Sequence, residues 1–290
     1  MIGLSPGHLR VMQIRKRGLT FDVDVAGPDG GAAVLLLHGF PQNRSMWSGI
    51  TSRLHAAGLR TIAPDQRGYS PGARPEPVEA YGITECADDA IALLDSLDVP
   101  SAHVVGHDWG AVAAWFAAGR HPERVRTLTA VSVPHPAAYA AALREDITQK
   151  LRSSYIGLFR LKGIAEAVLG ALDGKALRLM FTGSGLDRSR VDDYVAPLLA
   201  PGALTGALSW YRAMSADELA GLAPVDRPTT HVWSDGDGAV DRSAAERCAA
   251  YVTGPYRFVE LNGVTHWIAD QAPDALADAV LDRITAPLVP

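Results

Sequence analysis

Residues 102–111 read Ala102-His103-Val104-Val105-Gly106-His107-Asp108-Trp109-Gly110-Ala111. The composition predicts a strand over 102–105 and a helix over 111–118, joined by a Gly-x-acid-x-Gly turn. That order is the sequence form of a nucleophile elbow, in which flanking glycines relieve the crowding of a strained turn. The central residue of an elbow is usually serine, but here it is Asp108. A carboxylate is already anionic at neutral pH, so it can attack carbon without a base to deprotonate it. The alternative is an ordinary strand-to-helix turn in which Asp108 caps the helix.

The whole chain has the composition of a globular protein. It has 290 residues, of which 48% are hydrophobic and 20% charged, and its net charge of −5 gives no reason to expect nucleic acid as a partner. Cys86 and Cys248 are too few for a disulfide framework or a zinc knuckle and fit a reduced compartment. Residues 1–17 lack the features of a signal peptide, and no apolar run reaches the ~18 residues of a spanning helix. We therefore expect a cytoplasmic protein with no membrane partner.

Strands and helices alternate over most of the chain. This alternation predicts an α/β fold with a mostly parallel, doubly wound sheet, whose ligands bind at the carboxyl ends of the strands. The first two strands, joined by a tight turn, are expected to form an antiparallel hairpin. The predicted strands are 9–14, 19–25, 32–37, 59–63, 102–105, 125–131, 229–234 and 256–261, and the helices between and after them are 43–56, 84–97, 111–118, 243–251 and 274–284.

Between residues 135 and 220 the alternation stops. Helical runs occur there without a convincing buried strand, over 137–151, 163–172, 191–199 and 204–214. We interpret residues 135–220 as an inserted helical cap (lid) domain. Residues 1–134 and 221–290 would then form the core domain.

Two further residues follow predicted strands and could assist Asp108. Asp237 comes just past the strand at 229–234, and His266 lies in the loop after the strand at 256–261. His266 could take a proton from water, while Asp237 holds its tautomer and stabilises the imidazolium. The alternative is that both are ordinary surface loop residues. The backbone N–H groups of Phe40 and Trp109 are the expected oxyanion hole, because one follows the strand at 32–37 and the other begins the helix after Asp108.

Several motifs together resemble the epoxide hydrolases of the α/β-hydrolase fold. They are Gly106-His107-Asp108-Trp109-Gly110, His38-Gly39-Phe40-Pro41 and Thr265-His266-Trp267. The chain order nucleophile, acid, histidine is also that of the α/β hydrolases. The resemblance implies an α/β-hydrolase fold over about 32–273, a cis peptide at Phe40-Pro41, and structural roles for His38, Gly39, Pro41, Gly106 and Gly110.

Two segments of the insertion carry the more specific part of this resemblance. Tyr155-Ile156-Gly157-Leu158-Phe159 with Gly163-Ile164-Ala165-Glu166 is similar to the first lid-tyrosine segment of the family, and Leu208-Ser209-Trp210-Tyr211-Arg212 to the second. Opening an epoxide releases an alkoxide, and phenols with pKa ~10 keep their protons at neutral pH yet can donate them as charge develops. Tyr155 and Tyr211 are therefore the expected proton donors. For each tyrosine taken alone, helix packing is the alternative.

Some motifs fail on physical grounds. Gly3-Leu4-Ser5-Pro6-Gly7 matches the serine-hydrolase string, but no strand precedes it and proline has no N–H for an oxyanion hole. His103 and His107 have zinc-helix spacing but fall on a strand and a turn. Asp235-Gly236-Asp237 with Glu246 resembles a calcium loop only faintly, because Ala239 and Val240 stand at ligand and glycine positions. We expect no metal and no cofactor.

The sequence therefore predicts an epoxide hydrolase that forms an Asp108 alkyl ester and releases a vicinal diol from a small apolar epoxide. A haloalkane or haloacid dehalogenase with the same aspartate is the nearest alternative, and a non-catalytic ligand-binding protein on the same scaffold is the third. The sequence indicates no particular oligomeric state. The cap side chains that suggest an apolar pocket are Phe159, Leu161, Leu179, Met180, Phe181 and Trp210.

Overall fold

One eight-stranded sheet forms the centre of the computed structural model, which describes residues 9–287. The strand order is β1-β2-β4-β3-β5-β6-β7-β8. β2 pairs antiparallel with β1 and β4, and every other pair is parallel. The strands are β1 (Arg10–Lys16), β2 (Leu19–Ala26), β3 (Ala33–Leu37), β4 (Arg60–Pro64), β5 (Ala102–His107), β6 (Val125–Val131), β7 (Thr229–Gly236) and β8 (Tyr256–Thr265).

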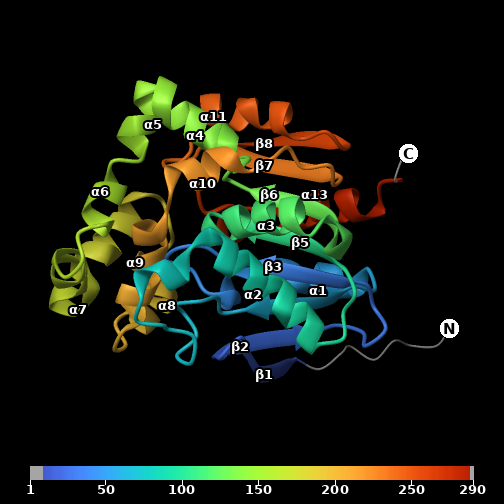
Figure 1. Ribbon diagram of the computed structural model, residues 1–290, viewed down its shortest axis with the longest axis horizontal. Coiled ribbons are helices and arrows are strands. Elements are labelled where there is room, and N and C mark those ends of the chain that lie inside the picture. The colour runs from blue at the N-terminus through green and yellow to red at the C-terminus, as the bar shows by residue number, and fades with distance from the viewer. Residues whose placement is uncertain (1–8, 288–290) are drawn as a thin grey trace.

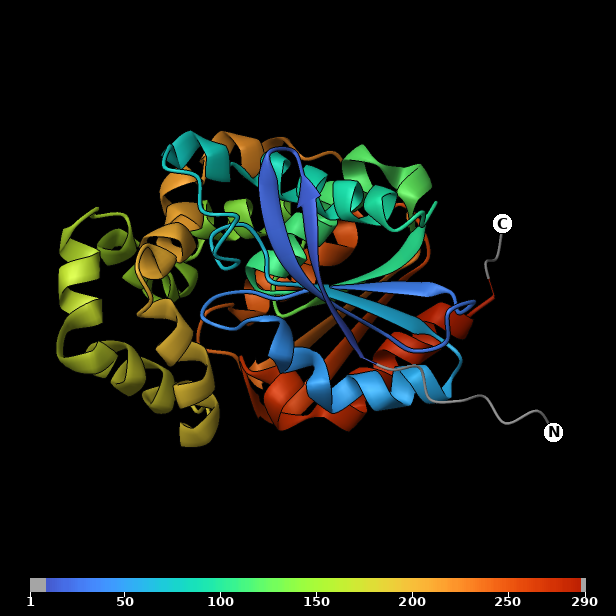
Figure 2. The same cartoon turned by 90° about the horizontal axis from the view of Figure 1, so that it is seen from below.

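Helices cover both faces of this sheet. α1 and α13 lie on one face and α2 and α3 on the other (Figure 2), so that every residue of β3 and β5 is buried. Burial on both faces explains why these strands are nearly continuous apolar runs. The helices of the core are α1 (Ser48–Ala56), α2 (Ile83–Ser96), α3 (Trp109–Arg120), α11 (Arg242–Arg247), α12 (Ile268–Gln271) and α13 (Pro273–Thr285), with short 3-10 helices η1 (Arg44–Trp47), η2 (Val78–Tyr81), η3 (Pro122–Arg124) and η4 (Cys248–Tyr251).

Seven consecutive helices lie between β6 and β7. Most of them gather at one end of the sheet, at the left of Figure 1, where α6 to α9 are seen together. They are α4 (Pro136–Glu145), α5 (Ile147–Arg152), α6 (Tyr155–Phe159), α7 (Ile164–Gly183), α8 (Arg188–Leu198), α9 (Ala203–Ala213) and α10 (Ala216–Gly221).

The predicted α/β-hydrolase fold is confirmed, including the eight strands and the helical run between the sixth and seventh. Among the strands, the predicted ends differ most at β8, which continues past residue 261 to Thr265. The helix predicted over 137–151 is two helices, because Asp146 has an extended backbone and caps α5 with its side chain. α6 and α10 were not predicted as helices. The Gly3–Gly7 motif lies outside the described residues.

Helix α7 is longer than the sequence predicts, and it is kinked. Leu172 and Asp173 have positive φ angles of 52° and 57°, followed by Gly174 at 69°. A periodicity argument ends the helix at 172 because the apolar pattern breaks there, whereas the chain resumes a second helical half after the kink.

A membrane-spanning helix is absent from residues 9–287, since none of the helices there combines enough length with enough apolar character.

Helix α9 packs closely against the loop that follows β4. An added Cβ on Gly206 would lie 2.7 Å from the carbonyl oxygen of Gly68, whose own φ is +90°. The Trp210 indole N–H donates to the Arg67 carbonyl at 2.8 Å in the same contact. Gly68 and Gly206 therefore let the backbone of α9 approach the core. This approach places Tyr211, the residue after Trp210, over the end of the sheet.

Replacing Gly206 tests this contact. Gly→Ala inside a helix normally stabilises by about 1 kcal/mol. We expect Gly206→Ala instead to destabilise the protein by about 1–3 kcal/mol, since the new methyl group must push α9 away from Gly68. Urea unfolding measures the difference. Gly157→Ala in α6, where an added Cβ meets nothing within 4 Å, is the control and should be neutral or stabilising. Equal effects of the two changes would contradict the close contact.

Candidate active site

Asp108 occupies the sharp turn between β5 and α3. Its φ of 52° and ψ of −122° are strained for a residue with a side chain. A Cβ on Gly106 would lie 2.2 Å from the carbonyl oxygen of Gly110, and one on Gly110 would lie 2.0 Å from that of Leu37. Both flanking glycines are thus required by close backbone contacts, as the elbow motif predicts.

The Asp108 carboxylate is buried and faces the loop after β3. Its Oδ1 accepts a hydrogen bond of 2.8 Å from the backbone N–H of Phe40. A Cβ on Gly39 would overlap the same carboxylate, at 2.3 Å from Oδ1. Burial raises the pKa of Asp108 above its ordinary value, although His266 and the N–H groups of Trp109 and Phe40 favour the charged form. Of the two predicted oxyanion-hole residues, Phe40 therefore donates its N–H to this carboxylate, and the Trp109 N–H favours its charged form.

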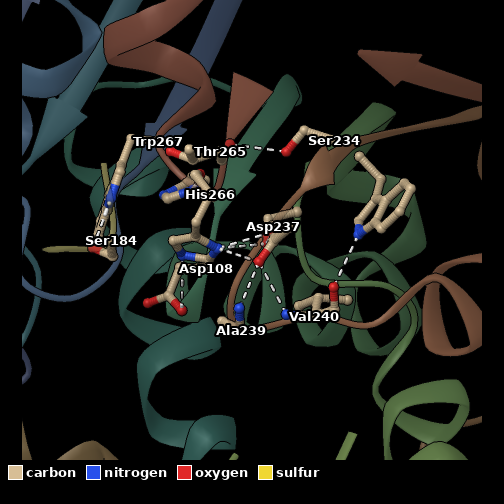
Figure 3. A network of polar contacts seen from close by, with 12 residues as sticks. Asp108, Ser184, Ser234, Asp237, Ala239, Val240, Thr265, His266 and Trp267 are labelled. Carbon is tan, nitrogen blue, oxygen red and sulfur yellow. Dashed lines mark hydrogen bonds and ion pairs between the residues drawn. The ribbon is translucent and has the colours of Figure 1, made fainter. Parts of the chain in front are cut away.

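His266 lies beside both Asp108 and Asp237 (Figure 3). The Nε2 atom of His266 is 3.7 Å from Oδ2 of Asp108. Its Nδ1 atom is 3.0 and 3.1 Å from the two carboxylate oxygens of Asp237. Asp237 is fully buried, and its Oδ1 also accepts from the N–H groups of Ala239 and Val240 at 2.8 and 2.9 Å. The fold thus brings together all three residues that follow strands β5, β7 and β8.

Charges in this cluster stabilise one another. Burial opposes ionisation of Asp237, but His266 and the hydrogen bonds of Ser132 and Val240 outweigh it and lower the pKa of Asp237 to about 2. Burial alone would also lower the pKa of His266, yet the carboxylates of Asp237 and Asp108 reverse this and raise it above its ordinary value. The arrangement is suited to an imidazole that accepts a proton.

His38 belongs to the frame of the site. Its Nε2 accepts from the Gln66 N–H at 3.0 Å, so the proton sits on Nδ1, which faces the Gly39 carbonyl at 3.0 Å. Burial lowers the pKa of His38, so it stays neutral. The Phe40–Pro41 peptide is cis, as the family resemblance implies. These residues shape the loop that presents the Phe40 N–H.

Tyr155 begins α6 and Tyr211 lies in α9, across the cavity from the sheet. Their ring centroids are 6.2 Å apart, and Tyr211 also packs edge-on against Phe40 and Trp109. Burial and the neighbouring Asp108 charge raise the pKa of each tyrosine well above 10, so both phenols keep their protons. Both tyrosines line the two cavities that Asp108 lines.

An ion pair connects the segments that carry the two tyrosines. Arg212, next to Tyr211, donates to both oxygens of Glu166 at 2.8 and 3.0 Å. Glu166 also accepts from Thr205 of α9 and from the backbone N–H of Gly163. Burial opposes the charge of Glu166, but its hydrogen bonds to Arg212, Thr205 and Gly163 lower its pKa to about 2.

Two adjoining cavities meet at Asp108. Their volumes are about 40 and 160 Å³, and they share Asp108, Tyr155, Tyr211 and Ala239. The first is lined further by Trp109, Val112, Val133, Pro136, Tyr139, Ile156, Met214, Leu219 and Val240. The second is lined further by Phe40, Phe159, Met180, Phe181, Ser184, Gly238, His266 and Trp267.

Three of the six apolar cap residues that suggest a pocket line a cavity beside Asp108. Phe159, Met180 and Phe181 line the second cavity, but Leu161 and Leu179 do not and are exposed at 49% and 64%. Sequence periodicity could not tell the outer face of α7 from its inner face, because both carry apolar residues. Trp210 is buried against the core.

Several residues around the site were missed. Tyr139 of α4 lines the first cavity, and Ser132 contacts Asp237 and His266. Ser132 follows β6 directly, at the same sheet edge as Asp108, and this position was the available signal. Gln149 and Arg152 of α5 bond the carbonyl groups of Ala239 and Asp237, which connects the helical run to the loop that carries Asp237.

The rejected motifs have structural roles. His103 is hydrogen-bonded to Thr127, and His107 donates to the His266 carbonyl at 2.9 Å. Burial lowers the pKa of these histidines to about 4 and about 3 respectively. Asp235 accepts from the Gly263 N–H. Over residues 9–287, no group of three or more His, Cys, Asp or Glu side chains is arranged to hold a metal ion.

The pKa of His266 offers a test of this geometry. In Asp237→Asn the charge that raises it is lost while burial persists, so we expect the pKa to fall from above 6.5 to below it. Titration of the histidine ring by NMR measures the change. Asp235→Asn removes a nearby carboxylate that does not contact His266 and should leave the titration unaltered. An unchanged His266 pKa in Asp237→Asn would contradict the pairing.

Comparisons with known proteins agree with the fold. The family model for the alpha/beta hydrolase fold matches residues 32–273. The chain is 33% identical over 276 residues to the AB hydrolase superfamily protein YfhM of Bacillus subtilis, covering 93% of this chain and 96% of that protein. It is 31% identical over 313 residues to Epoxide hydrolase A of Mycobacterium tuberculosis, covering 92% and 95%.

A solved structure is similar over almost the whole chain. Epoxide Hydrolase A from Mycobacterium thermoresistibile has a TM-score of 0.82 at 29% identity, covering 97% of this chain and 100% of that chain. The similarity covers both the sheet and the helices between β6 and β7. The chain therefore belongs to the α/β-hydrolase fold family and, within it, to the epoxide hydrolase group.

Proposed function

We propose that this protein hydrolyses an epoxide to a vicinal diol through a covalent ester on Asp108. The observation that carries the proposal is the placement of Asp108 and two protonated phenols on the walls of the same two cavities. A carboxylate can attack carbon, and phenols can protonate the oxygen that leaves it. Relatives named epoxide hydrolases support the same conclusion.

In the first step a carboxylate oxygen of Asp108 attacks one ring carbon, and the carbon–oxygen bond of the epoxide breaks. Tyr155 and Tyr211 hydrogen-bond the ring oxygen, and one of them gives it a proton. The product is a hydroxyalkyl ester of Asp108. The raised pKa of both tyrosines keeps them protonated until the alkoxide, a stronger base, develops beside them.

In the second step His266 takes a proton from water, and the hydroxide attacks the ester carbonyl of Asp108. Asp237 holds the proton on Nδ1 and stabilises the imidazolium that forms. The Phe40 N–H, which already donates to the carboxylate, and the Trp109 N–H stabilise the oxyanion. The acyl–oxygen bond then breaks, and the imidazolium returns its proton to the leaving alkoxide, which departs as the diol. The Asp108 carboxyl group is left protonated, and its proton restores the phenol that donated in the first step. Both steps use only water and groups of this chain.

The cavity walls favour a small apolar epoxide. Most of the lining residues are aliphatic or aromatic, apart from those that carry the chemistry, which are Asp108, Tyr155, Tyr211 and His266. Helices α4 to α10 supply both phenols and much of this wall, so we assign them the role of a cap over the core. Helix α5 bonds the loop that carries Asp237, which couples the cap to the base.

Isotope labelling tests the ester. A single turnover with excess enzyme in ¹⁸O-water should give unlabelled diol, because the new oxygen comes from Asp108. His266→Gln should accumulate an adduct detectable by mass spectrometry, since ester formation does not need the base. Labelled diol in the first turnover would rule out the ester route. Halide release from haloalkanes without diol formation from epoxides would favour a dehalogenase.

The phenols can be tested separately. Tyr155→Phe and Tyr211→Phe should each slow ester formation about tenfold, because one donor remains, and the double variant should slow it ~10²–10⁴-fold. Stopped-flow measurement of adduct formation reports this step. Tyr256→Phe, in a tyrosine of β8 remote from both cavities, is the control. A double variant that forms the ester at the normal rate would exclude the phenols as the acid.

A further inference from the structure

Ser132 has an unusual backbone. It is not glycine, yet its φ is +67°, in the left-handed region that is costly for residues with a side chain. Three hydrogen bonds hold the turn: Ser132 N–H donates to the Val232 carbonyl at 2.8 Å, His231 Nε2 donates to the Ser132 carbonyl at 3.0 Å, and Val133 N–H donates to the Val131 carbonyl at 2.9 Å. The surrounding sheet therefore enforces the strain.

The strained turn directs the Ser132 hydroxyl at the polar pair behind Asp108. Oγ donates to Oδ2 of Asp237 at 2.6 Å and lies 3.0 Å from Nδ1 of His266. The hydroxyl has only one proton, and it is used on Asp237. Its lone pairs therefore face the imidazole, and every neighbour of Nδ1 is an acceptor. Such an environment favours the tautomer with the proton on Nδ1 and the free lone pair on Nε2, toward Asp108.

We infer that Ser132 is a positioning residue for the Asp237–His266 pair, and that its left-handed backbone exists to bring its hydroxyl between them. This inference rests on the proposed function and deepens it. Oδ1 of Asp237 accepts hydrogen bonds from the backbone N–H groups of Ala239 and Val240, and Oδ2 accepts one from the Ser132 hydroxyl. The carboxylate therefore cannot rotate without losing a hydrogen bond. The imidazole then keeps its ring plane between the two aspartates.

His231 supports this role from the next strand. It is fully buried, and burial lowers its pKa to about 4, so it is neutral and has a single N–H to donate. That N–H is used on the Ser132 carbonyl. His231 therefore fixes the peptide of Ser132, and Ser132 in turn fixes the carboxylate of Asp237.

Other charged and titratable groups face the same pair and stay in place when Ser132 is changed. Asp108 lies 3.7 Å from His266, and the neutral His107 ring packs 4.7 Å from it and bonds its carbonyl. The Arg152 guanidinium donates to the Asp237 carbonyl from α5. Tyr139 and Tyr155 face the pair from the cavity side.

Two variants separate the hydroxyl from the backbone. Ser132→Ala removes the hydroxyl and keeps the strain, whereas Ser132→Gly removes the hydroxyl and relieves it. Without the Ser132 donor the Asp237 charge acts more fully on the imidazolium, so we expect the His266 pKa to rise by about half to one unit in both variants. NMR titration without substrate measures it. Ester breakdown should slow about tenfold at neutral pH and its acid limb should move to higher pH, with ester formation unchanged.

Ser70→Ala is the matched control. Ser70 is equally buried, and its hydroxyl also makes two hydrogen bonds, to the Asp65 carbonyl and from the Asp22 N–H, but it contacts neither Asp237 nor His266. We expect it to lower thermal stability and leave the His266 titration unchanged. If both Ser132 variants behave like Ser70→Ala, Ser132 is only structural and the inference is wrong. The His266 titration tests the role of Ser132 even if the protein turns over no epoxide. Failure to turn over any epoxide would count against the proposed function alone.

Discussion

The short contact between the Phe40 N–H and the Asp108 carboxylate is the interaction on which the site depends. A buried carboxylate is expensive to ionise unless donors surround it. The loop after β3 can come close enough only because Gly39 has no side chain there, and the turn itself can close only because Gly106 and Gly110 have none. Three glycines at the ends of two strands thus allow the Asp108 carboxylate to be buried there. The cavities, the phenols of Tyr155 and Tyr211 and the imidazole of His266 all lie around it.

Much of the fold could be predicted from the sequence, because local patterns determine it. The apolar runs of β3 and β5, the glycines of the elbow and the order of Asp108, Asp237 and His266 are all visible along the chain. Parallel strands place their carboxyl ends at one edge, so residues that follow strands converge. The two tyrosines came from family resemblance, since nothing local distinguishes them from packing residues.

Other features depend on tertiary contacts and left little trace in the sequence. Ser132 adopts a left-handed backbone because neighbouring strands bond its peptide, and no composition rule marks that. Helix α7 resumes beyond its kink and carries apolar residues such as Leu179 on its solvent-facing side as well as Met180 in the cavity wall, so the sequence does not show which of them line the pocket. Strands and turns can be predicted from a few neighbouring residues. Which side chains line the pocket depends on packing between segments that are far apart in the sequence.

The bidentate pair of Glu166 and Arg212 has a consequence for how such pockets diversify. It joins α9, which carries Tyr211, to the start of α7, which follows the helix of Tyr155, and so restrains the two segments relative to each other. The spacing of the phenols is thereby insulated from changes elsewhere in the wall. In the proposed mechanism, side chains such as Met180 or Tyr139 could therefore change in bulk and polarity without moving the acid, so that substrate range and acid catalysis would be separable.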